Sequence, residues 1–183
     1  MNIFVGCSSR DVTDNVKWSR YCTATLEVTK FITAHKHTLV FGGCARGLMG
    51  LMYKCMLLNK ANIIVAIPQA YINDAEELFY SNLFDFNTVS ERKDWIFKNT
   101  SMHIFLPGGI GTIDELFSSI EAKRCGEHNS PIIIINEQGY FNDVLHVLAR
   151  VYDEGFADEK DAKLYTVCLL YTSDAADDSL RVD

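Results

Sequence analysis

The sequence lacks several features that would assign it to a common functional class. Its 183 residues hold 17 lysines and arginines against 24 aspartates and glutamates, so the net charge of −7 gives no basic surface for nucleic acid or an anionic membrane. The longest apolar runs, such as Ile132–Ile135, fall far short of the roughly 18 residues that a membrane span requires. No signal peptide precedes Val5. We therefore expect a cytoplasmic protein without a nucleic-acid or membrane partner.

The cysteines also lack the spacing of a metal or redox site. No two of them form a CxxC pair, and none has a histidine at zinc-ligand spacing. In a cytoplasmic protein we expect reduced thiols. The sequence predicts no metal site and no cofactor. The six cysteines are Cys7, Cys22, Cys44, Cys55, Cys125 and Cys168.

The C-terminal segment differs in kind from the rest of the chain. Residues 168–178 read CLLYTSDAADD, which resembles the translation of a transposase sequencing adapter. We therefore expect residues 168–183 to be a non-native tail and the natural chain to continue past Val167. An ordinary acidic tail is the alternative, and no function is assigned to this segment.

Short β-branched runs alternate with amphipathic stretches up to about Val167. This pattern predicts an α/β fold, a Rossmann-like doubly wound parallel sheet in a three-layer αβα arrangement, with residues 1–167 as one domain. The near-continuous hydrophobicity of the strands indicates burial on both faces. The expected strands are Ile3–Val5, Thr38–Phe41, Ile63–Ile67, Leu83–Val89, Met102–Leu106 and Ile132–Ile135, with a seventh starting near Leu164. The expected helices are Asp14–His35, Gly47–Leu58, Ser90–Asn99, Thr112–Cys125 and Tyr140–Glu154.

Ligands of doubly wound sheets bind beyond the carboxyl ends of the strands, so the strand-to-helix loops are the expected site. The first loop reads GCSS at Gly6–Ser9, where the Ser8 hydroxyl could donate to a phosphate, although a plain loop is the alternative. The second, residues 41–50, reads FGGCARGLMG and departs from the GxGxxG spacing of a dinucleotide site. Glycines such as Gly43 still allow backbone amides to approach a ligand closely. A structural tight turn explains this loop equally well.

Two adjacent cations follow the fourth expected strand. If Ser90 caps the next helix, Arg92 and Lys93 lie in its first turn, where the helix macrodipole disfavours positive charge. A bound anion or a nearby carboxylate would offset that repulsion. The alternative is that both side chains extend into solvent.

The loop after Met102–Leu106 is rich in glycine and reads PGGIGTIDE over Pro107–Glu115. Three glycines leading into a helix leave unpaired N–H groups at the positive end of the dipole, a natural cradle for phosphate, to which Thr112 adds a hydroxyl. Asp114 and Glu115 are expected in the first turn, where acidic residues are favoured for structural reasons alone.

The PGGxGTxxE pattern, with Arg92 and Lys93 upstream, resembles the Lonely Guy (LOG) family of nucleoside 5′-monophosphate phosphoribohydrolases, whose members were often labelled lysine decarboxylases. The GCSS turn, the GLMG at Gly47–Gly50 and the element order extend the resemblance over residues 1–167. Cys44 stands where the family usually has a third glycine, and Val89 where it usually has methionine. We expect Cys44 to narrow the ligand site and Val89 to be tolerated as apolar packing, so these departures concern substrate choice more than reaction type.

The resemblance implies hydrolysis of the N-glycosidic bond of a purine or cytokinin riboside 5′-monophosphate, such as AMP or an N6-substituted AMP, to free base and ribose 5-phosphate. Glu115 is then the catalytic carboxylate that stabilises the oxocarbenium-like ribose and orients water, and Arg92 is the second catalytic residue, which positions Glu115 and the ribose or phosphate. Asp74 belongs to an acidic run that surface solvation explains equally well. The expected substrate- and phosphate-binding residues are Gly108, Gly109, Gly111, Thr112, Lys93, Gly43, Ser8 and Asp74.

Other functions stay open at this point. A non-catalytic nucleotide-sensing module would use the same cradle, although binding alone does not require a carboxylate facing the ribose. Lysine decarboxylation needs an electron sink such as pyridoxal phosphate, and no lysine has a convincing Schiff-base context. The family forms homodimers, which we expect here, and the Met-rich residues 48–57 could supply the interface or lie in the core. His103, on a buried strand, is expected to be a core residue.

Overall fold

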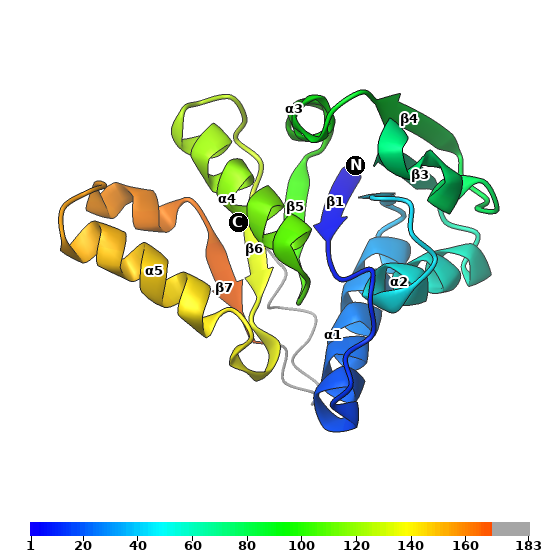
Figure 1. Cartoon of the computed structure of the whole chain (residues 1–183), viewed down its shortest axis with the longest axis horizontal. Coiled ribbons are helices and arrows are strands. Elements are labelled where there is room, and N and C mark those ends of the chain that lie inside the picture. Colours follow the sequence, from blue (N-terminus) through cyan, green and yellow to red (C-terminus); the bar gives the residue numbers. More distant parts are fainter. Residues whose placement is uncertain (170–183) are drawn as a thin grey trace.

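A parallel sheet lies between two layers of helices in the computed structural model, which describes residues 1–169 (Figure 1). The strands follow the order β4-β3-β2-β1-β5-β6-β7. Their bounds are β1 Asn2–Gly6, β2 Thr38–Phe41, β3 Ile63–Pro68, β4 Asn82–Phe86, β5 Met102–Phe105, β6 Ile132–Ile135 and β7 Thr166–Cys168. The α-helices are α1 Asn15–Ala34, α2 Gly47–Leu58, α3 Val89–Asn99, α4 Ile110–Arg124 and α5 Asn142–Asp153. Short 3-10 helices are η1 Gln69–Ala75, η2 Glu137–Gly139 and η3 Glu159–Lys163.

Each face of the sheet carries its own apolar core, because successive side chains of a strand point to opposite faces. On one face Ile3, Val5 and Phe41 pack with residues of α1 and α2 such as Val28 and Met52. On the other face the cluster joins strands to α3, α4 and α5, through residues that include Phe4, Val40, Ile134, Ile96, Leu116 and Leu148. Figure 1 shows α4 and α5 on one side of the sheet and α1 and α2 on the other. The predicted doubly wound fold is therefore confirmed.

The Met-rich helix α2 belongs mainly to the first core. Leu48, Met52 and Met56 are almost completely buried there, and α2 lies beside α1. Leu58 at its C-terminal end is 83% exposed. These three buried side chains are therefore core residues and are not available for a subunit interface.

The chain reverses its direction of strand addition between β1 and β5. From β1 the sheet grows through β2 and β3 to β4, and from β5 it grows the other way through β6 to β7. The loops that leave these two strands touch, since the Ser8 amide donates to the Pro107 carbonyl at 3.1 Å. Such a switch point is where doubly wound sheets bind ligands.

Helix α3 begins one residue earlier than predicted, and its cap is Thr88 and not Ser90. The Thr88 hydroxyl accepts from the Glu91 amide at 3.1 Å, and the Glu91 carboxylate accepts from the Thr88 amide at 3.3 Å. This capping box places Arg92 and Lys93 beyond the first turn. The predicted repulsion by the helix macrodipole therefore does not hold, and Val89, expected in apolar packing, is 43% exposed at the first helical position.

Two other boundaries differ from the sequence prediction. Helix α4 begins at Ile110 with Gly109 as its N-cap, so Asp114 and Glu115 lie past the first turn, contrary to expectation. Strand β4 ends at Phe86 and lies at the edge of the sheet, where most of its residues are exposed or half-buried, so the expectation of burial on both faces is wrong for it. The other predicted elements agree with the structure to within two or three residues at their ends.

Within residues 1–169, no helix has the length and hydropathy needed to cross a membrane. Strand β7 extends to Cys168, one residue into the segment that the sequence predicts to be non-native, and pairs in parallel with β6. The rest of that predicted tail, residues 170–183, lies outside the described residues.

Candidate active site

Arg92 and Glu115 are charged residues at core-facing positions of two helices on the same face of the sheet. On α4 the buried stripe Thr112, Glu115 and Ser119 follows the spacing of three and four that defines one side of a helix. On α3, Arg92 precedes the buried Ile96 by one turn. The helical period therefore directs both charged side chains inward, where they meet.

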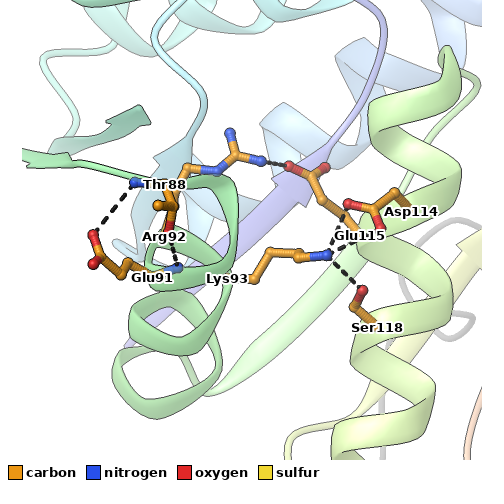
Figure 2. A network of polar contacts seen from close by, with 7 residues as sticks. All are labelled: Thr88, Glu91, Arg92, Lys93, Asp114, Glu115 and Ser118. Carbon is orange, nitrogen blue, oxygen red and sulfur yellow. Dashed lines mark hydrogen bonds and ion pairs between the residues drawn. The ribbon is translucent and has the colours of Figure 1, made fainter. Parts of the chain in front are cut away.

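The guanidinium of Arg92 donates to the Glu115 carboxylate, and Figure 2 shows the two side chains directed toward each other from α3 and α4. The side chains are only 11% and 6% exposed. The pair lies over the carboxyl ends of β1 and β2: a Cβ added to Gly6 would be 3.0 Å from Glu115 Oε2, and one added to Gly42 would be 3.5 Å from Arg92 Nη1. Gly6 thus leaves room for Glu115 beside the switch point, whereas a side chain at position 42 would make an ordinary contact with Arg92.

One donor of this pair has no partner. Arg92 Nε is buried and makes no hydrogen bond to any described residue. Buried polar groups are normally satisfied, so an orphan donor requires an explanation. Here it lies on an arginine at the expected ligand-binding edge of the sheet, where a ligand or water oxygen could accept from it.

Burial raises the pKa of the Glu115 carboxyl above its ordinary value, and the positive charge of Arg92 acts against this rise. Asp114 adds a smaller upward influence and Lys93 a smaller downward one. Desolvation thus favours the neutral form of the carboxyl, and the ion pair with Arg92 favours the ionised form. This is the arrangement expected of a carboxylate that works in a water-poor site.

Lys93 on α3 forms hydrogen bonds to side chains of α4. Its ammonium contacts Asp114 Oδ1 and Oδ2 at 3.0 and 2.9 Å and Ser118 Oγ at 2.9 Å (Figure 2). The Lys93 side chain is 16% exposed and that of Asp114 is 46% exposed. Lys93 therefore ties α3 to α4 next to the Arg92–Glu115 pair. A nearby carboxylate was one of the two partners expected for this cation, although the sequence did not identify it as Asp114.

The glycine loop forms an open helix N-terminus. Gly109 is the N-cap of α4, and no side chain caps the first turn that contains Gly111 and Thr112. A Cβ added to Gly109 or Gly111 would meet nothing within 4 Å, whereas one added to Gly108 would collide with Thr112 Oγ1 at 2.1 Å. Thr112 is buried against Gly108, whereas Gly109 and Gly111 have open space where a side chain would stand.

The remaining predicted residues occupy neighbouring loops. The Ser8 hydroxyl donates to the Arg10 carbonyl at 2.6 Å and accepts from the Arg10 amide, so it is used within its own loop. Gly43 has a φ of +77°, and a Cβ there would lie 2.6 Å from Val65 Cγ1, which explains why glycine is needed. Asp74, on η1, forms a 3.6 Å ion pair with Arg46. The side-chain contacts of Ser8 and Asp74 are thus with Arg10 and Arg46, and not with the Arg92–Glu115 pair.

Tyr140 was not predicted as a site residue. Its hydroxyl donates to the carbonyl oxygen of Gly108, from the loop that follows β6. The sequence did contain a signal, because Tyr140 lies after a predicted strand next to the one that leads into the glycine loop. The sequence prediction places Tyr140 at the start of the last helix, whereas that helix begins at Asn142.

Three comparisons with known proteins show the family and the fold to which this chain is similar. The family model described as "Possible lysine decarboxylase" matches residues 49–177. The chain is 32% identical over 150 residues to the probable cytokinin riboside 5′-monophosphate phosphoribohydrolase LOG4 of Oryza sativa subsp. japonica, covering 80% of this chain and 64% of that protein. It is 30% identical over 139 residues to cytokinin riboside 5′-monophosphate phosphoribohydrolase LOG1 of Arabidopsis thaliana, covering 74% and 64%.

The fold is also similar to a solved structure of the molybdenum cofactor carrier protein of Chlamydomonas reinhardtii. That comparison has a TM-score of 0.64 at 18% identity and covers 91% of this chain and 88% of the other, so it shows the fold alone. The chain spans just under two thirds of the two curated relatives named above. The family model nevertheless matches well over half of the chain, and the relatives agree with it, so this chain belongs to the LOG family, whose model carries the description possible lysine decarboxylase.

Proposed function

We propose that the protein hydrolyses the N-glycosidic bond of a purine or cytokinin riboside 5′-monophosphate and releases the free base and ribose 5-phosphate. The observation that carries the proposal is the buried Arg92–Glu115 pair beside the uncapped N-terminus of α4. The names of the LOG relatives give the same reaction class.

Glu115 is the catalytic carboxylate of the proposed reaction. Cleavage of the bond between base and ribose builds positive charge on the sugar, and a carboxylate in a water-poor site stabilises that charge strongly. The side chain is 6% exposed, so little solvent screens it. In the same position the carboxylate can orient the attacking water or accept its proton.

Arg92 holds Glu115 in place and opposes the effect of burial on its pKa. Its guanidinium favours the ionised form of the carboxyl and fixes its direction, and its unpartnered Nε leaves one donor for a ligand oxygen or a water. Lys93 supports the pair from the next position by joining α3 to Asp114 on α4.

The first turn of α4 is the proposed site for the 5′-phosphate. Its N–H groups have no side-chain cap, and no atom lies within 4 Å of the position that a Cβ would take at Gly109 or Gly111. A phosphate at a helix N-terminus is favoured by these donors and by the helix dipole. Binding energy from this remote group would orient the ribose at Glu115.

The test is the release of free base, followed by chromatography, from AMP and from an N6-substituted AMP, with the matching nucleosides as controls. We expect base from the monophosphates and far less from the nucleosides, because the nucleosides lack the group that the α4 N-terminus would bind. The monophosphate from which base is released faster identifies the base preference.

Binding of the monophosphates without release of base would overturn the proposal in favour of a nucleotide-sensing module. Equal release from monophosphates and nucleosides would instead leave a nucleosidase that does not use the α4 N-terminus. Titration of AMP into the same protein preparation measures the binding on which the first of these outcomes depends.

The proposal includes a cytoplasmic homodimer. Cys7, Cys22, Cys44, Cys55 and Cys125 are free thiols, as is usual in a reducing compartment. Since Leu48, Met52 and Met56 are core residues, a dimer interface must use other surfaces. Light scattering on the purified chain tests this part, and a monomer at micromolar concentration would contradict it.

A further inference from the structure

The tyrosine that follows η2 reaches across to the glycine loop of the neighbouring strand. Tyr140 lies after β6, and its hydroxyl donates to the carbonyl oxygen of Gly108, one residue before the N-cap of α4. Strands β5 and β6 are paired, so the two loops leave the same edge of the sheet side by side. The contact therefore links the proposed phosphate site to the loop after β6, to which the proposed function assigns no role.

The backbone around Tyr140 is held firmly. Asn136, at the end of β6, is buried; its Oδ1 accepts from the Phe141 amide at 2.7 Å and its Nδ2 donates to Asn142 Oδ1 at 2.9 Å. Between Asn136 and Phe141, Gln138 has a backbone φ of +55°, a conformation that residues other than glycine rarely adopt. This geometry is maintained by the surrounding hydrogen bonds and presents Tyr140 in one orientation.

The ring of Tyr140 is also packed on two sides. It lies edge-on to Tyr21 of α1, with ring centroids 5.8 Å apart, and edge-on to the buried Phe141 at 4.9 Å. A phenol fixed in this way can act as a rigid donor toward Gly108. Because the ring is already packed, the Tyr140 side chain loses less conformational entropy on bonding to Gly108 than a freely rotating side chain would.

The bond to Gly108 constrains the next amide. A trans peptide is planar, so the carbonyl of Gly108 and the N–H of Gly109 point in opposite directions. Gly109 has no side chain and open space beside it, so packing at that residue does little to fix this plane. A hydrogen bond to the carbonyl both orients the Gly109 N–H away from Tyr140 and polarises it as a donor.

The adjacent peptide is held from the other side of the switch point. The Ser8 amide, in the loop after β1, donates to the Pro107 carbonyl at 3.1 Å. Two successive carbonyls of the glycine loop, at 107 and 108, thus accept from the loops after β1 and after β6. The cradle is fixed before any ligand arrives.

We propose that Tyr140 is a positioning residue that preorganises the anion cradle of α4, so that it increases affinity for ligands carrying a phosphate and leaves affinity for the same ligands without phosphate unchanged. This inference rests on the phosphate site of the proposed function. It does not require that hydrolysis occurs.

The test is Tyr140→Phe, which removes the hydroxyl and keeps the ring. AMP and adenosine are titrated calorimetrically into the full chain with and without this substitution, in a Glu115→Gln background so that AMP is not consumed. We expect AMP to bind about three- to ten-fold more weakly, the range for loss of one hydrogen bond, while adenosine binding is unchanged or too weak to measure in both proteins. The amide resonance of Gly109 should also shift, because its N–H is no longer polarised.

Tyr152→Phe is the matched control. It also removes a tyrosine hydroxyl that donates to a backbone carbonyl, that of Asp161 at 3.5 Å, but on α5 and η3. We expect this variant to bind AMP as the parent does. A similar loss in both variants would mean that the Tyr140 effect is one of general stability, and would overturn the proposal.

The same titrations separate this proposal from that of the reaction. AMP affinity unchanged within two-fold in Tyr140→Phe, or an equal loss for adenosine, overturns the role of Tyr140 alone. AMP that binds wild-type protein without release of base overturns the hydrolytic function, while the comparison of the two tyrosines still decides this inference. Absence of AMP binding in the parent overturns both.

Discussion

At the scale of the residue, the defining feature is an ion pair placed where a hydrophobic pair would serve stability at least as well. Arg92 and Glu115 are both buried, and removing two charges from water costs several kcal/mol per ion before their attraction offsets it. The pair leaves Arg92 Nε without a partner. A chain that needed only a packed core would gain nothing from this arrangement, which is why we assign it to the site.

The pH dependence of the proposed reaction should follow from the Glu115 carboxyl, if that group has the proposed role. It must be ionised to stabilise positive charge on the ribose, and burial raises its pKa. Activity is therefore lost as pH falls through the raised pKa, so the acid limb of kcat/KM should lie above the ordinary glutamate value of 4.5. Initial rates with AMP between pH 4 and pH 9 measure this limb.

Arg92→Gln should move that limb to still higher pH, because it removes the largest influence that lowers the carboxyl pKa. Lys98→Gln, an exposed change on the same helix, is the control and should leave the limb in place. An acid limb that is the same in all three proteins would show that another group controls the profile.

At the scale of the element, the site depends on how α3 and α4 are joined. The Lys93–Asp114 ion pair joins them next to the Arg92–Glu115 pair, and the capping box of Thr88 and Glu91 fixes where α3 begins (Figure 2). The two helices thus present their charged residues in register. Loss of either the ion pair or the capping box would weaken the positioning of α3 against α4 without changing Arg92 or Glu115.

A double-mutant cycle with Lys93→Met and Asp114→Asn should give a coupling energy of about 0.5–1 kcal/mol in the free energy of unfolding, at the upper end for exposed pairs because Lys93 is largely buried. Urea unfolding of the four proteins measures it. The exposed pair Arg124 and Glu121, on α4 alone, gives the matched cycle. A Lys93–Asp114 coupling near zero would mean that α3 and α4 are held by packing alone.

The elements themselves were largely predictable. The sequence analysis also named Arg92 and Glu115, which the structure brings together, and their catalytic roles stay a proposal. Glycine and capping signals gave the strand-to-helix loops, and the PGGxGTxxE pattern pointed to Glu115. What the sequence could not give was contact between elements that lie far apart along the chain. The pairing of Lys93 with Asp114 and of Tyr140 with Gly108 joins residues 21 and 32 positions apart, which no local periodicity encodes.

Element ends were missed for local reasons. Ser90 and Thr88 are both good caps, and only Thr88 has a glutamate three residues later to complete the box. The apolar content of β4 suggested a buried strand, but its place at the edge of the sheet depends on the order of all strands. Such topology is a property of the assembled fold.

At the scale of the whole molecule, a buried histidine connects the sheet to both site helices. His103 on β5 is fully buried, and its ring nitrogens contact Ser119 Oγ of α4 at 2.7 Å and Thr100 Oγ1, at the end of α3, at 2.8 Å. Since Thr100 Oγ1 donates to the Ile96 carbonyl, it accepts from His103 Nε2. The expectation that His103 is a satisfied core residue is confirmed.

This histidine makes stability depend on pH. Burial lowers the pKa of His103 from 6.5 to about 3, so between these values the unfolded chain binds a proton that the native chain does not. The free energy of unfolding should therefore fall as pH is lowered, by about 2 kcal/mol between pH 7 and pH 5 from this residue. His128, whose pKa burial also lowers, adds to the fall.

Urea unfolding at pH 7, 6 and 5 tests this, with His103→Gln expected to reduce the fall by about 2 kcal/mol. The exposed His146→Gln is the control and should keep the parent's pH dependence. If His103→Gln loses as much stability on acidification as the parent, the buried imidazole is not the source.

The most direct test of the account is the turnover of AMP by Glu115→Gln, compared with Glu121→Gln, an exposed carboxamide change on the same helix. If the Glu115 carboxylate stabilises the developing charge, its loss should raise the barrier by several kcal/mol, about 10²–10³-fold or more in kcat, in a protein that remains folded. Glu121→Gln should retain parental turnover. Near-parental turnover by a folded Glu115→Gln protein would contradict the assignment and with it the proposed mechanism.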